Sequence, residues 1–410
     1  MKIRIKKFEA ESIVILMFSI LPIIDSVNGY LATEGKFSIG TLYKMVVLVV
    51  LAVLIFLKSD RADKRDLMIS VMLIGFVCAS IGINVGLGGT IISKEFPIKF
   101  IFNILTLVTL MQLVKQKIIS GNAFYRIFDI GTLLMVICIM VPYILKVGYS
   151  IYSGNIGYKG FFYSQNELTA VLLILLYFSL YNLICNFSIK SILQTGGISL
   201  SILLTNTKSS MIACALGVVV FVIEYLRRRE SKHKMVLIAL AVVVIVGASG
   251  FVGRQIAGFM QRQTSLSNMY GKSIIATITS GRSYYIADAW SELMQNGHQF
   301  LKILIGNGFC SNVLVEMDFL DMFFFLGLTG VLGYCILGFW VYKKSARNYK
   351  SDHTIIRRVG FLIVLAFSFL TGHIVFYATS GCYFILLCLF DLYYETSERK
   401  VAKRCRSLVL

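Results

Sequence analysis

Charge is scarce in this sequence. Only 15% of its 410 residues are Asp, Glu, Lys or Arg, whereas 57% are hydrophobic. A soluble domain of this length needs more charge to stay in solution, so the composition excludes an ordinary soluble protein. The apolar residues form blocks close to the roughly 20 residues that a helix needs to cross a bilayer. The sequence therefore predicts an all-α polytopic membrane protein.

Paired cysteines and internal repeats are also lacking. The nine cysteines include no CxxC pair and lie mostly inside apolar blocks. This distribution favours a packing role over a disulfide framework or a metal site. No direct or inverted repeat of the kind that many transporters contain is visible, which weakens the alternative of a transporter or flippase.

About twelve apolar blocks are long enough to be transmembrane helices. They lie near residues 12–31, 39–57, 67–86, 98–114, 127–146, 167–185, 189–205, 209–226, 235–252, 313–342, 359–378 and 380–394. The first follows the basic segment MKIRIKK without a small-residue cleavage site, so we expect a retained helix. We expect helices one to nine within 1–252, a large extracytoplasmic loop over 253–312, helices ten to twelve within 313–394 and a basic cytoplasmic tail over 395–410.

The net charge of +19 raises the question of nucleic-acid binding. If the N-terminus is cytoplasmic, 28 of the 40 basic residues fall on the inner side, 11 fall outside, and Lys44 lies within a span. This asymmetry follows the positive-inside rule, so the basic residues set orientation and contact anionic lipid instead of nucleic acid. We therefore expect both termini to be cytoplasmic.

The longest polar interval contains the stretch TITSGRSYYIADAW, residues 277–290. One apolar stripe at helical spacing runs through it and just beyond: Ile286, Ala289, Trp290 and Leu293. This spacing predicts a short amphipathic helix, with Trp290 anchoring it to the core or to the membrane interface.

Arg282 is expected in the first turn of that helix, with Ser280 or Ser283 as its N-cap. A helix N-terminus offers free N–H groups, and an adjacent guanidinium adds a bidentate clamp for an anion. The alternative is an arginine that only reaches toward lipid phosphate at the interface.

Polar residues near the outer ends of other blocks are further candidates. Asn166 either binds substrate or caps a helix, and Lys208 either binds phosphate or marks the membrane interface. His298 and His373 could serve as bases or ligands, although a lone histidine is more often satisfied by local hydrogen bonds.

Three acidic residues open the tenth block: Glu316, Asp318 and Asp321. In a helix Asp318 and Asp321 share a face and Glu316 points nearly the opposite way, so the three do not form one metal cage. A partly buried Glu316 is a candidate general base. The alternative is a favourable interaction with the helix dipole.

Five segments in order resemble the landmarks of the O-antigen polymerase and O-antigen ligase superfamily. They are GFFYSQNELTAVLL, LTNTKSSMIA, TSGRSYYIADAW, ILIGNGF and EMDFLDMFFFLGLTGVLG. The family pattern has an Asn after a Gly-Phe turn, a Thr/Ser-Arg turn, Ser-Gly-Arg before a Trp, a Gly-x-Gly and a helix ending in Gly-Leu-x-Gly. The resemblance extends over about residues 157–390, and the N-terminal third matches in general topology only.

The resemblance implies a GT-C-like, metal-independent membrane glycosyltransferase that takes glycan from a polyprenyl-diphosphate carrier and uses no cofactor. Carried over by motif, it implies Arg282 and Lys208 as contacts of the diphosphate. From the chemistry of the residues we expect Glu316, with Arg282, to be catalytic. We expect Asn166, Asp318, Asp321 and His373 to be further substrate contacts.

Two departures from the family pattern bear on the reaction. Lys208 stands where an arginine is usual, which reduces a fork to a point charge. In ligases a His-Asn pair opens the helix that ends in Gly-Leu-x-Gly, and this chain has Glu316 and Met317 there. This departure favours a polymerase.

The sequence therefore predicts an enzyme that polymerises undecaprenyl-diphosphate-linked repeat units into capsular polysaccharide, exopolysaccharide or O-antigen. It would act at the outer face of the bacterial cytoplasmic membrane, with a flippase and a chain-length regulator as partners. The alternatives are a ligase that transfers glycan to a lipid, wall or protein acceptor, and a transporter or flippase of lipid-linked sugars.

Overall fold

The computed structural model describes residues 7–56, 64–91, 95–152, 156–227, 257, 260, 261, 263–269, 271, 273–295, 297–311, 313–352, 355–372 and 374–394. The predicted ninth block (235–252), the basic tail (395–410) and His373 lie outside these residues.

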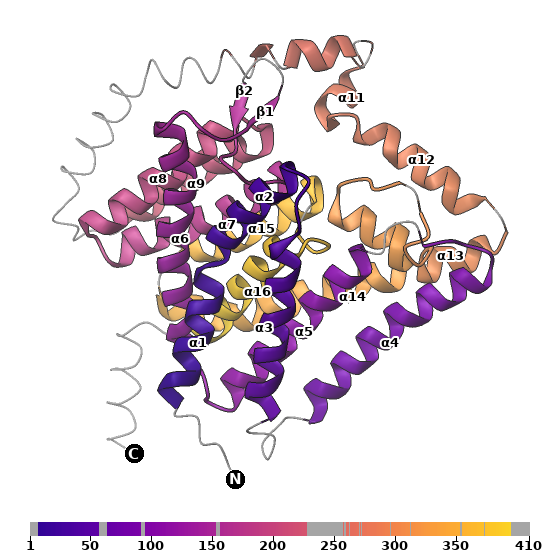
Figure 1. Ribbon diagram of the computed structural model, residues 1–410, viewed down its shortest axis with the longest axis horizontal. Helices are drawn as coiled ribbons and strands as arrows, with labels where there is room; N and C mark the ends of the chain where they lie inside the picture. The colour runs from indigo at the N-terminus through magenta and orange to yellow at the C-terminus, as the bar shows by residue number, and fades with distance from the viewer. Residues whose placement is uncertain are drawn as a thin grey trace.

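The described chain is largely α-helical (Figure 1). The first helices are α1 (Lys7–Ser19), α2 (Leu21–Thr33), α3 (Ile39–Phe56), α4 (Lys64–Gly86), α5 (Glu95–Lys115), α6 (Gly121–Ile144), α7 (Gln165–Cys185), α8 (Ile189–Thr205) and α9 (Lys208–Arg227). The later helices are α11 (Ile274–Thr279), α12 (Arg282–Met294), α13 (Gln299–Ile305), α14 (Asp318–Asp352), α15 (Ile355–Thr371) and α16 (Ala378–Tyr393). Each predicted block other than 235–252 coincides with a helix or, for the first block, with the pair α1 and α2.

A small antiparallel ribbon adds two strands to the expected all-helical architecture. Strands β1 (Ser150–Tyr152) and β2 (Ile156–Tyr158) pair with Ser150 opposite Tyr158. A Cβ on Gly157 would lie 2.8 Å from the Thr205 carbonyl oxygen, so the ribbon packs directly on the end of α8.

Five described segments are long and apolar enough to cross a membrane: Glu9–Thr33, Glu95–Lys115, Gly121–Ile144, Gln165–Cys185 and Asp318–Lys343. Shorter apolar helices accompany them over Ile39–Ile55, Val71–Gly86, Ile189–Thr205, Ser209–Tyr225 and Ala378–Tyr393. The chain is a polytopic helical membrane protein, as the hydrophobic pattern predicts.

Helix α7 forms the centre of the bundle. Its residues from Leu168 to Leu183 are buried, and it packs against α8, α9, α15 and α16. A helix that is hydrophobic on all sides must be surrounded by other helices, which explains why α7 has no polar face.

The end of the bundle where α1 begins also holds the start of α6 and the end of α16. Glu11 accepts hydrogen bonds from the hydroxyl and the backbone N–H of Ser120. A Cβ on Gly121 would lie 2.2 Å from the Tyr393 carbonyl oxygen, so the chain segments pack closely here. We call this the Glu11 end.

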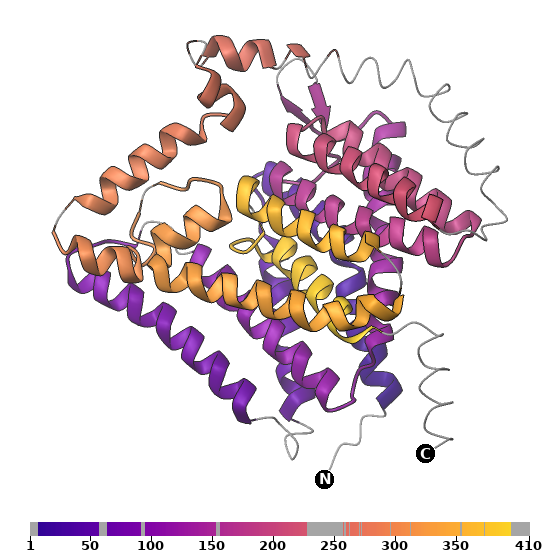
Figure 2. The same cartoon turned by 180° about the vertical axis from the view of Figure 1, so that it is seen from behind.

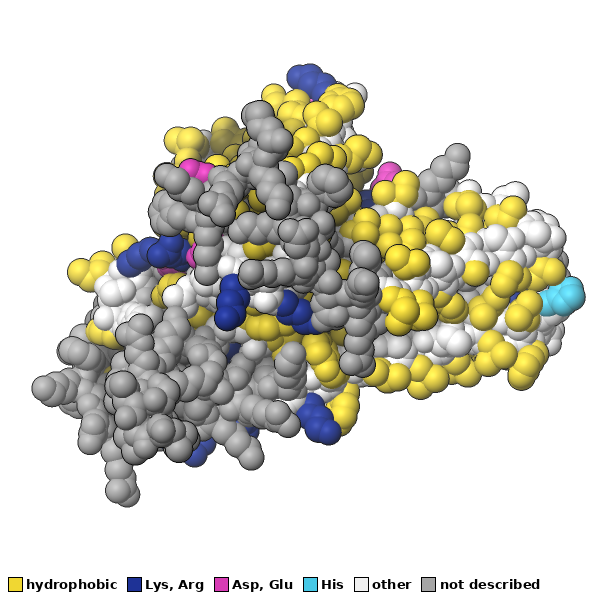
Figure 3. Space-filling view, turned by 90° about the horizontal axis from the view of Figure 1, so that it is seen from below, with side chains coloured by type: hydrophobic (Ala, Val, Ile, Leu, Met, Phe, Trp, Pro, Cys, Tyr) yellow, Lys and Arg dark blue, Asp and Glu magenta, His cyan; other side chains and the backbone are white. Residues whose placement is uncertain are grey.

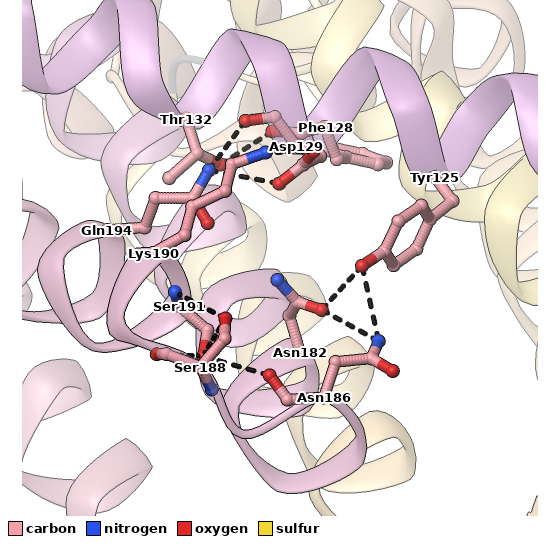
Figure 4. A network of polar contacts seen from close by, with 10 residues as sticks. All are labelled: Tyr125, Phe128, Asp129, Thr132, Asn182, Asn186, Ser188, Lys190, Ser191 and Gln194. Atoms are coloured by element: carbon pink, nitrogen blue, oxygen red, sulfur yellow. Dashed lines mark hydrogen bonds and ion pairs between the residues drawn. The ribbon is translucent and has the colours of Figure 1, made fainter.

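A polar network at the Glu11 end ties α6, α7 and α8 together where α7 ends and α8 begins (Figure 4). The Lys190 ammonium lies 2.6 Å from the Asp129 carboxylate, and the Gln194 amide donates to the same carboxylate. Tyr125 donates a hydrogen bond to the Asn182 side chain over 2.6 Å.

The interval between α9 and α14 carries α11, α12 and α13, which form an arm beside the main bundle together with α4 (Figures 1 and 2). Seen from below Figure 1, the projecting side of the molecule shows mainly hydrophobic side chains, and several Lys and Arg side chains lie toward the main body (Figure 3).

Candidate active site

A sharp turn places Arg282 at the first position of α12. Ser280 and Gly281 both adopt the left-handed conformation, with φ of 55° and 85°. Gly281 is the N-cap residue, and the hydroxyl of Thr279 accepts a hydrogen bond from the backbone N–H of Ser283. The prediction of Arg282 in the first turn is confirmed, but neither serine is the N-cap, because both left-handed residues are needed to reverse the chain after α11.

The apolar stripe of α12 attaches the helix to the start of α14. Ala289 and Leu293 are buried in one cluster with Val315 and Phe324. The Trp290 ring stacks on Phe323 with 6.3 Å between the ring centroids. The predicted amphipathic helix is therefore confirmed, and its packing holds Arg282 in a defined place.

Glu316 precedes α14 instead of standing in it, which corrects the expectation that three acidic residues open one helix. Its backbone is left-handed, with φ of 64°, an uncommon conformation for a residue other than glycine. The carboxylate of Asp321 holds this conformation by accepting hydrogen bonds from the backbone N–H groups of Val315 and Met317, at 2.8 and 3.0 Å. Asp321 thus fixes the backbone on both sides of Glu316.

Asp318 fixes a second chain segment. One oxygen of its carboxylate accepts from the Ser368 hydroxyl at 2.7 Å and from the backbone N–H groups of Ile374 and Val375. Asp318 and Asp321 are both nearly fully buried. Their predicted contact with substrate stays a prediction, and the contacts that the structure gives them are to the chain itself.

The structure brings Arg282 and Glu316 together, although 34 residues separate them. The Arg282 Nη2 lies 3.5 Å from Glu316 Oε2 and donates to the Thr371 carbonyl oxygen at 3.4 Å. The Arg282 side chain is 15% exposed and that of Glu316 is 38% exposed. Among the described residues, Arg282 Nε is buried without a hydrogen-bond partner.

The close approach between Glu316 and the end of α15 depends on Gly372. Its φ is +64°, and a Cβ there would lie 2.6 Å from the Glu316 carbonyl oxygen. A glycine is therefore required where the two segments cross. The sequence analysis considered only His373 in this segment and missed the roles of Thr371 and Gly372.

The predicted Gly-x-Gly and Gly-Leu-x-Gly landmarks interlock. The backbone N–H groups of Asn307 and Gly308 donate to the carbonyl oxygens of Phe324 and Phe325, at 2.8 and 3.0 Å. At Gly327 the helix α14 is broken, with φ of 66° and ψ of −166°. The two motifs thus form one structural unit.

The structure says less about the contacts of the remaining predicted site residues. Asn166 lies in the first turn of α7, where Ser164 is the N-cap residue. Lys208 is the first residue of α9, and its side chain lies outside the described part of the structure. His298 is exposed in the turn before α13, and His373 is not described. Their predicted contacts with substrate stay predictions.

An apolar cavity of about 420 Å³ lies between α4, α5, α14 and α16. Phe76, Phe100, Leu326 and Phe384 are among the side chains that line it. Val375 also lines it, and the backbone N–H of Val375 is bonded to Asp318. The cavity therefore adjoins the same chain segment that the Arg282–Glu316 pair contacts through Thr371.

The fold and this site define a polytopic membrane protein with a cation and a carboxylate paired at one end of its helical bundle. Residues 8–265 match the family described as O-antigen ligase like membrane protein, and the chain belongs to this family. It is therefore a membrane enzyme of a glycan-transferring family. No curated protein matches the chain.

The matched residues include Asn166 and Lys208 and end before Arg282 and Glu316. They begin near the N-terminus, in the third of the chain where the sequence motifs showed only a general likeness. The family assignment and the geometry of the Arg282–Glu316 pair are thus independent observations.

Proposed function

We propose that this protein polymerises undecaprenyl-diphosphate-linked oligosaccharide repeat units at the outer face of the bacterial cytoplasmic membrane. The observation that carries the proposal is the pairing of Arg282 with Glu316. A guanidinium suited to a diphosphate and a carboxylate suited to a hydroxyl group lie within 3.5 Å of each other at one end of the bundle.

The reaction needs both groups. The acceptor hydroxyl oxygen attacks the anomeric carbon of the donor glycan, and the bond from that carbon to the diphosphate oxygen breaks. Arg282 stabilises the negative charge on the departing diphosphate. Glu316 takes the proton of the acceptor hydroxyl. Lys208 is proposed as a second cation for the diphosphate.

The proposed architecture is the twelve-span, GT-C-like arrangement with cytoplasmic termini. The apolar cavity between α4, α5, α14 and α16 suits part of a polyprenyl chain, because it is lined by apolar side chains and adjoins Val375. The carrier would thus place its diphosphate near the Arg282–Glu316 pair while its chain stays among the helices.

Transfer of finished glycan to a lipid, wall or protein acceptor is the second candidate function, because the matched family is described by its likeness to O-antigen ligase. Against this candidate, Glu316 and Met317 stand where the ligase pattern has a His-Asn pair. The same charge stabilisation and proton transfer would serve either reaction.

The experiment that separates these functions is analysis of carrier-linked glycans in cells that lack the protein. A polymerase predicts single carrier-linked repeat units and the loss of long glycan. Long carrier-linked chains would indicate a ligase instead, and units confined to the inner leaflet would indicate a flippase.

An elongation assay with purified protein in detergent tests the proposed reaction directly. We expect the protein to elongate carrier-linked units without ATP and in the presence of a metal chelator. A strict requirement for a divalent cation would contradict the proposed mechanism and return attention to Asp318 and Asp321 as ligands.

A further inference from the structure

Two charged side chains inside the bundle have no part in the proposed chemistry. Asp25 lies on α2 and Lys44 on α3, with 3.7 Å between Lys44 Nζ and Asp25 Oδ1. Their side chains are only 14% and 19% exposed. Ionisable groups at such positions in a membrane protein are costly and mark functional sites by default.

Glu167 is the third member of this group. One of its carboxylate oxygens accepts from the backbone N–H groups of Thr379 and Ser380, at 2.9 and 3.3 Å. Its charge interacts with both Asp25 and Lys44. Four helices, α2, α3, α7 and α16, therefore meet around one ammonium and two carboxylates.

The group lies at the same end of the bundle as the Arg282–Glu316 pair. Helix α15 begins beside the Glu11 end, where Arg357 is bonded to Asp391, and it ends at Thr371, the residue that Arg282 contacts. Helix α16 starts a few residues later, where Glu167 binds its first turn. The connection from α15 to α16 thus joins the two groups.

The bonding of Asp25 and Lys44 is incomplete. Their separation of 3.7 Å exceeds an ordinary hydrogen bond. The Thr379 side chain also interacts with the Asp25 carboxylate, but the carboxylate oxygen Oδ2 is buried without a hydrogen-bond partner among the described residues. The ion pair of Arg357 with Asp391 is shorter: its atoms lie 2.9 Å apart, and Arg357 also donates to the Phe390 carbonyl oxygen. A buried carboxylate oxygen with no donor is costly, so it requires an explanation.

We propose that Asp25 and Lys44 bind the sugar hydroxyls of the carrier-linked glycan, and that Glu167 positions the start of α16 beside them. This inference rests on the proposed function. A sugar hydroxyl can donate a hydrogen bond to the Asp25 carboxylate and accept one from the Lys44 ammonium. A neutral polyol therefore supplies hydrogen bonds to both charged groups. Two carboxylates around one ammonium disfavour an anion, which separates this site from the diphosphate contact at Arg282.

The test compares two probes on purified protein. One is the carrier-linked repeat unit extracted from cells that lack the protein, and the other is undecaprenyl diphosphate without sugar. The double substitution Asp25→Asn with Lys44→Gln removes both charges together, so that no uncompensated charge stays buried. We expect it to weaken binding of the repeat unit by about tenfold or more, the loss of one or two hydrogen bonds to charged groups. Binding of undecaprenyl diphosphate should not change.

The pair Asp129→Asn with Lys190→Gln is the matched control, because it removes an interhelical ion pair at the Glu11 end. It should leave the binding of both probes unchanged. The exchanged pair Asp25→Lys with Lys44→Asp separates ligand binding from support of the fold. It preserves the ion pair but reverses the groups that face the sugar, so binding of the repeat unit should stay weak.

The outcomes are distinct. Normal binding of the repeat unit by the double variant overturns the inference and leaves the proposed function intact. Equal loss of both probes, or full recovery in the exchanged pair, shows a structural ion pair and also overturns it. If the unchanged protein does not bind the repeat unit, the proposed function fails, and the inference fails with it.

Discussion

At the residue scale, the opposite charges of Arg282 and Glu316 neutralise each other in the protein without substrate. With substrate bound, we expect the two side chains to act on different groups, the diphosphate and the acceptor hydroxyl. Their ion pair is long, at 3.5 Å, and the carboxylate is partly exposed. A long, partly exposed pair of this kind contributes about 1 kcal/mol or less to stability. Substitutions of these residues should therefore change activity far more than the stability of the fold. The two substitutions should also affect different steps, the stabilisation of the diphosphate and the removal of the proton.

Arg282→Lys keeps the positive charge and loses the planar fork that binds a diphosphate through two hydrogen bonds. We expect a loss of roughly 1.5–3 kcal/mol in kcat/KM, about ten- to hundredfold, measured as elongation of carrier-linked units. Arg126→Lys is the matched control, because Arg126 is exposed on α6 at the Glu11 end. Full activity of Arg282→Lys would show that the guanidinium geometry is not used.

Glu316→Gln removes the proposed base and preserves the size of the side chain. Turnover should fall by about a hundredfold or more while the protein folds and binds its carrier normally. The control is Glu95→Gln, which breaks an exposed ion pair with Lys99 within α5. Near-normal polymer from Glu316→Gln at matched protein level would exclude the base and direct attention to His298 or His373.

At the scale of elements, the site depends on a broken helix. Helix α14 is interrupted at Gly327, and the segment before the break pairs with the turn at Asn307 and Gly308. Ser80 and Asn84 of α4 donate to carbonyl oxygens of Ile305 and Gly306. Irregular backbone within a membrane protein is tolerated where protein groups satisfy it, and these side chains do so.

Gly306→Ala tests this interlock. The φ of Gly306 is +75°, and a Cβ would lie 2.3 Å from atoms of Phe325. We expect destabilisation of about 2 kcal/mol or more, from backbone strain and overpacking together, measured as the midpoint of thermal unfolding in detergent. Gly196→Ala, at an open position on α8, should be neutral or stabilising. Equal midpoints for the two variants would contradict the interlock.

At the scale of the whole molecule, the orientation of the protein in the membrane decides which compartment the site faces, and therefore whether its substrate can reach it. Both termini are expected in the cytoplasm and the arm of α11 to α13 outside, because 28 of 40 basic residues fall on one side under this arrangement. A reporter fused at Lys302 and one fused after Leu410 should report opposite compartments. Finding both in the same compartment would remove the basis for an extracytoplasmic reaction.

The sequence by itself determined the helices and the class of protein. Apolar runs are long and local, so the helices from α1 to α9 and from α14 to α16 follow from composition and periodicity. The stripe of Ala289 and Leu293 likewise predicted α12, because one face of a short helix must be buried.

Only the tertiary structure decided how the site is assembled. Arg282 and Glu316 are 34 residues apart, and Thr371 and Gly372 are more distant still, so no local pattern encodes their contact. The same holds for Asp25 and Lys44, on neighbouring helices, and for the contact of Glu167 on α7 with the start of α16. Sequence reasoning placed Glu316 in a helix, because it could not foresee that Asp321 would turn back to hold the chain before α14. Contacts between distant segments depend on the packing of all the helices at once, whereas a helix depends mainly on its own residues.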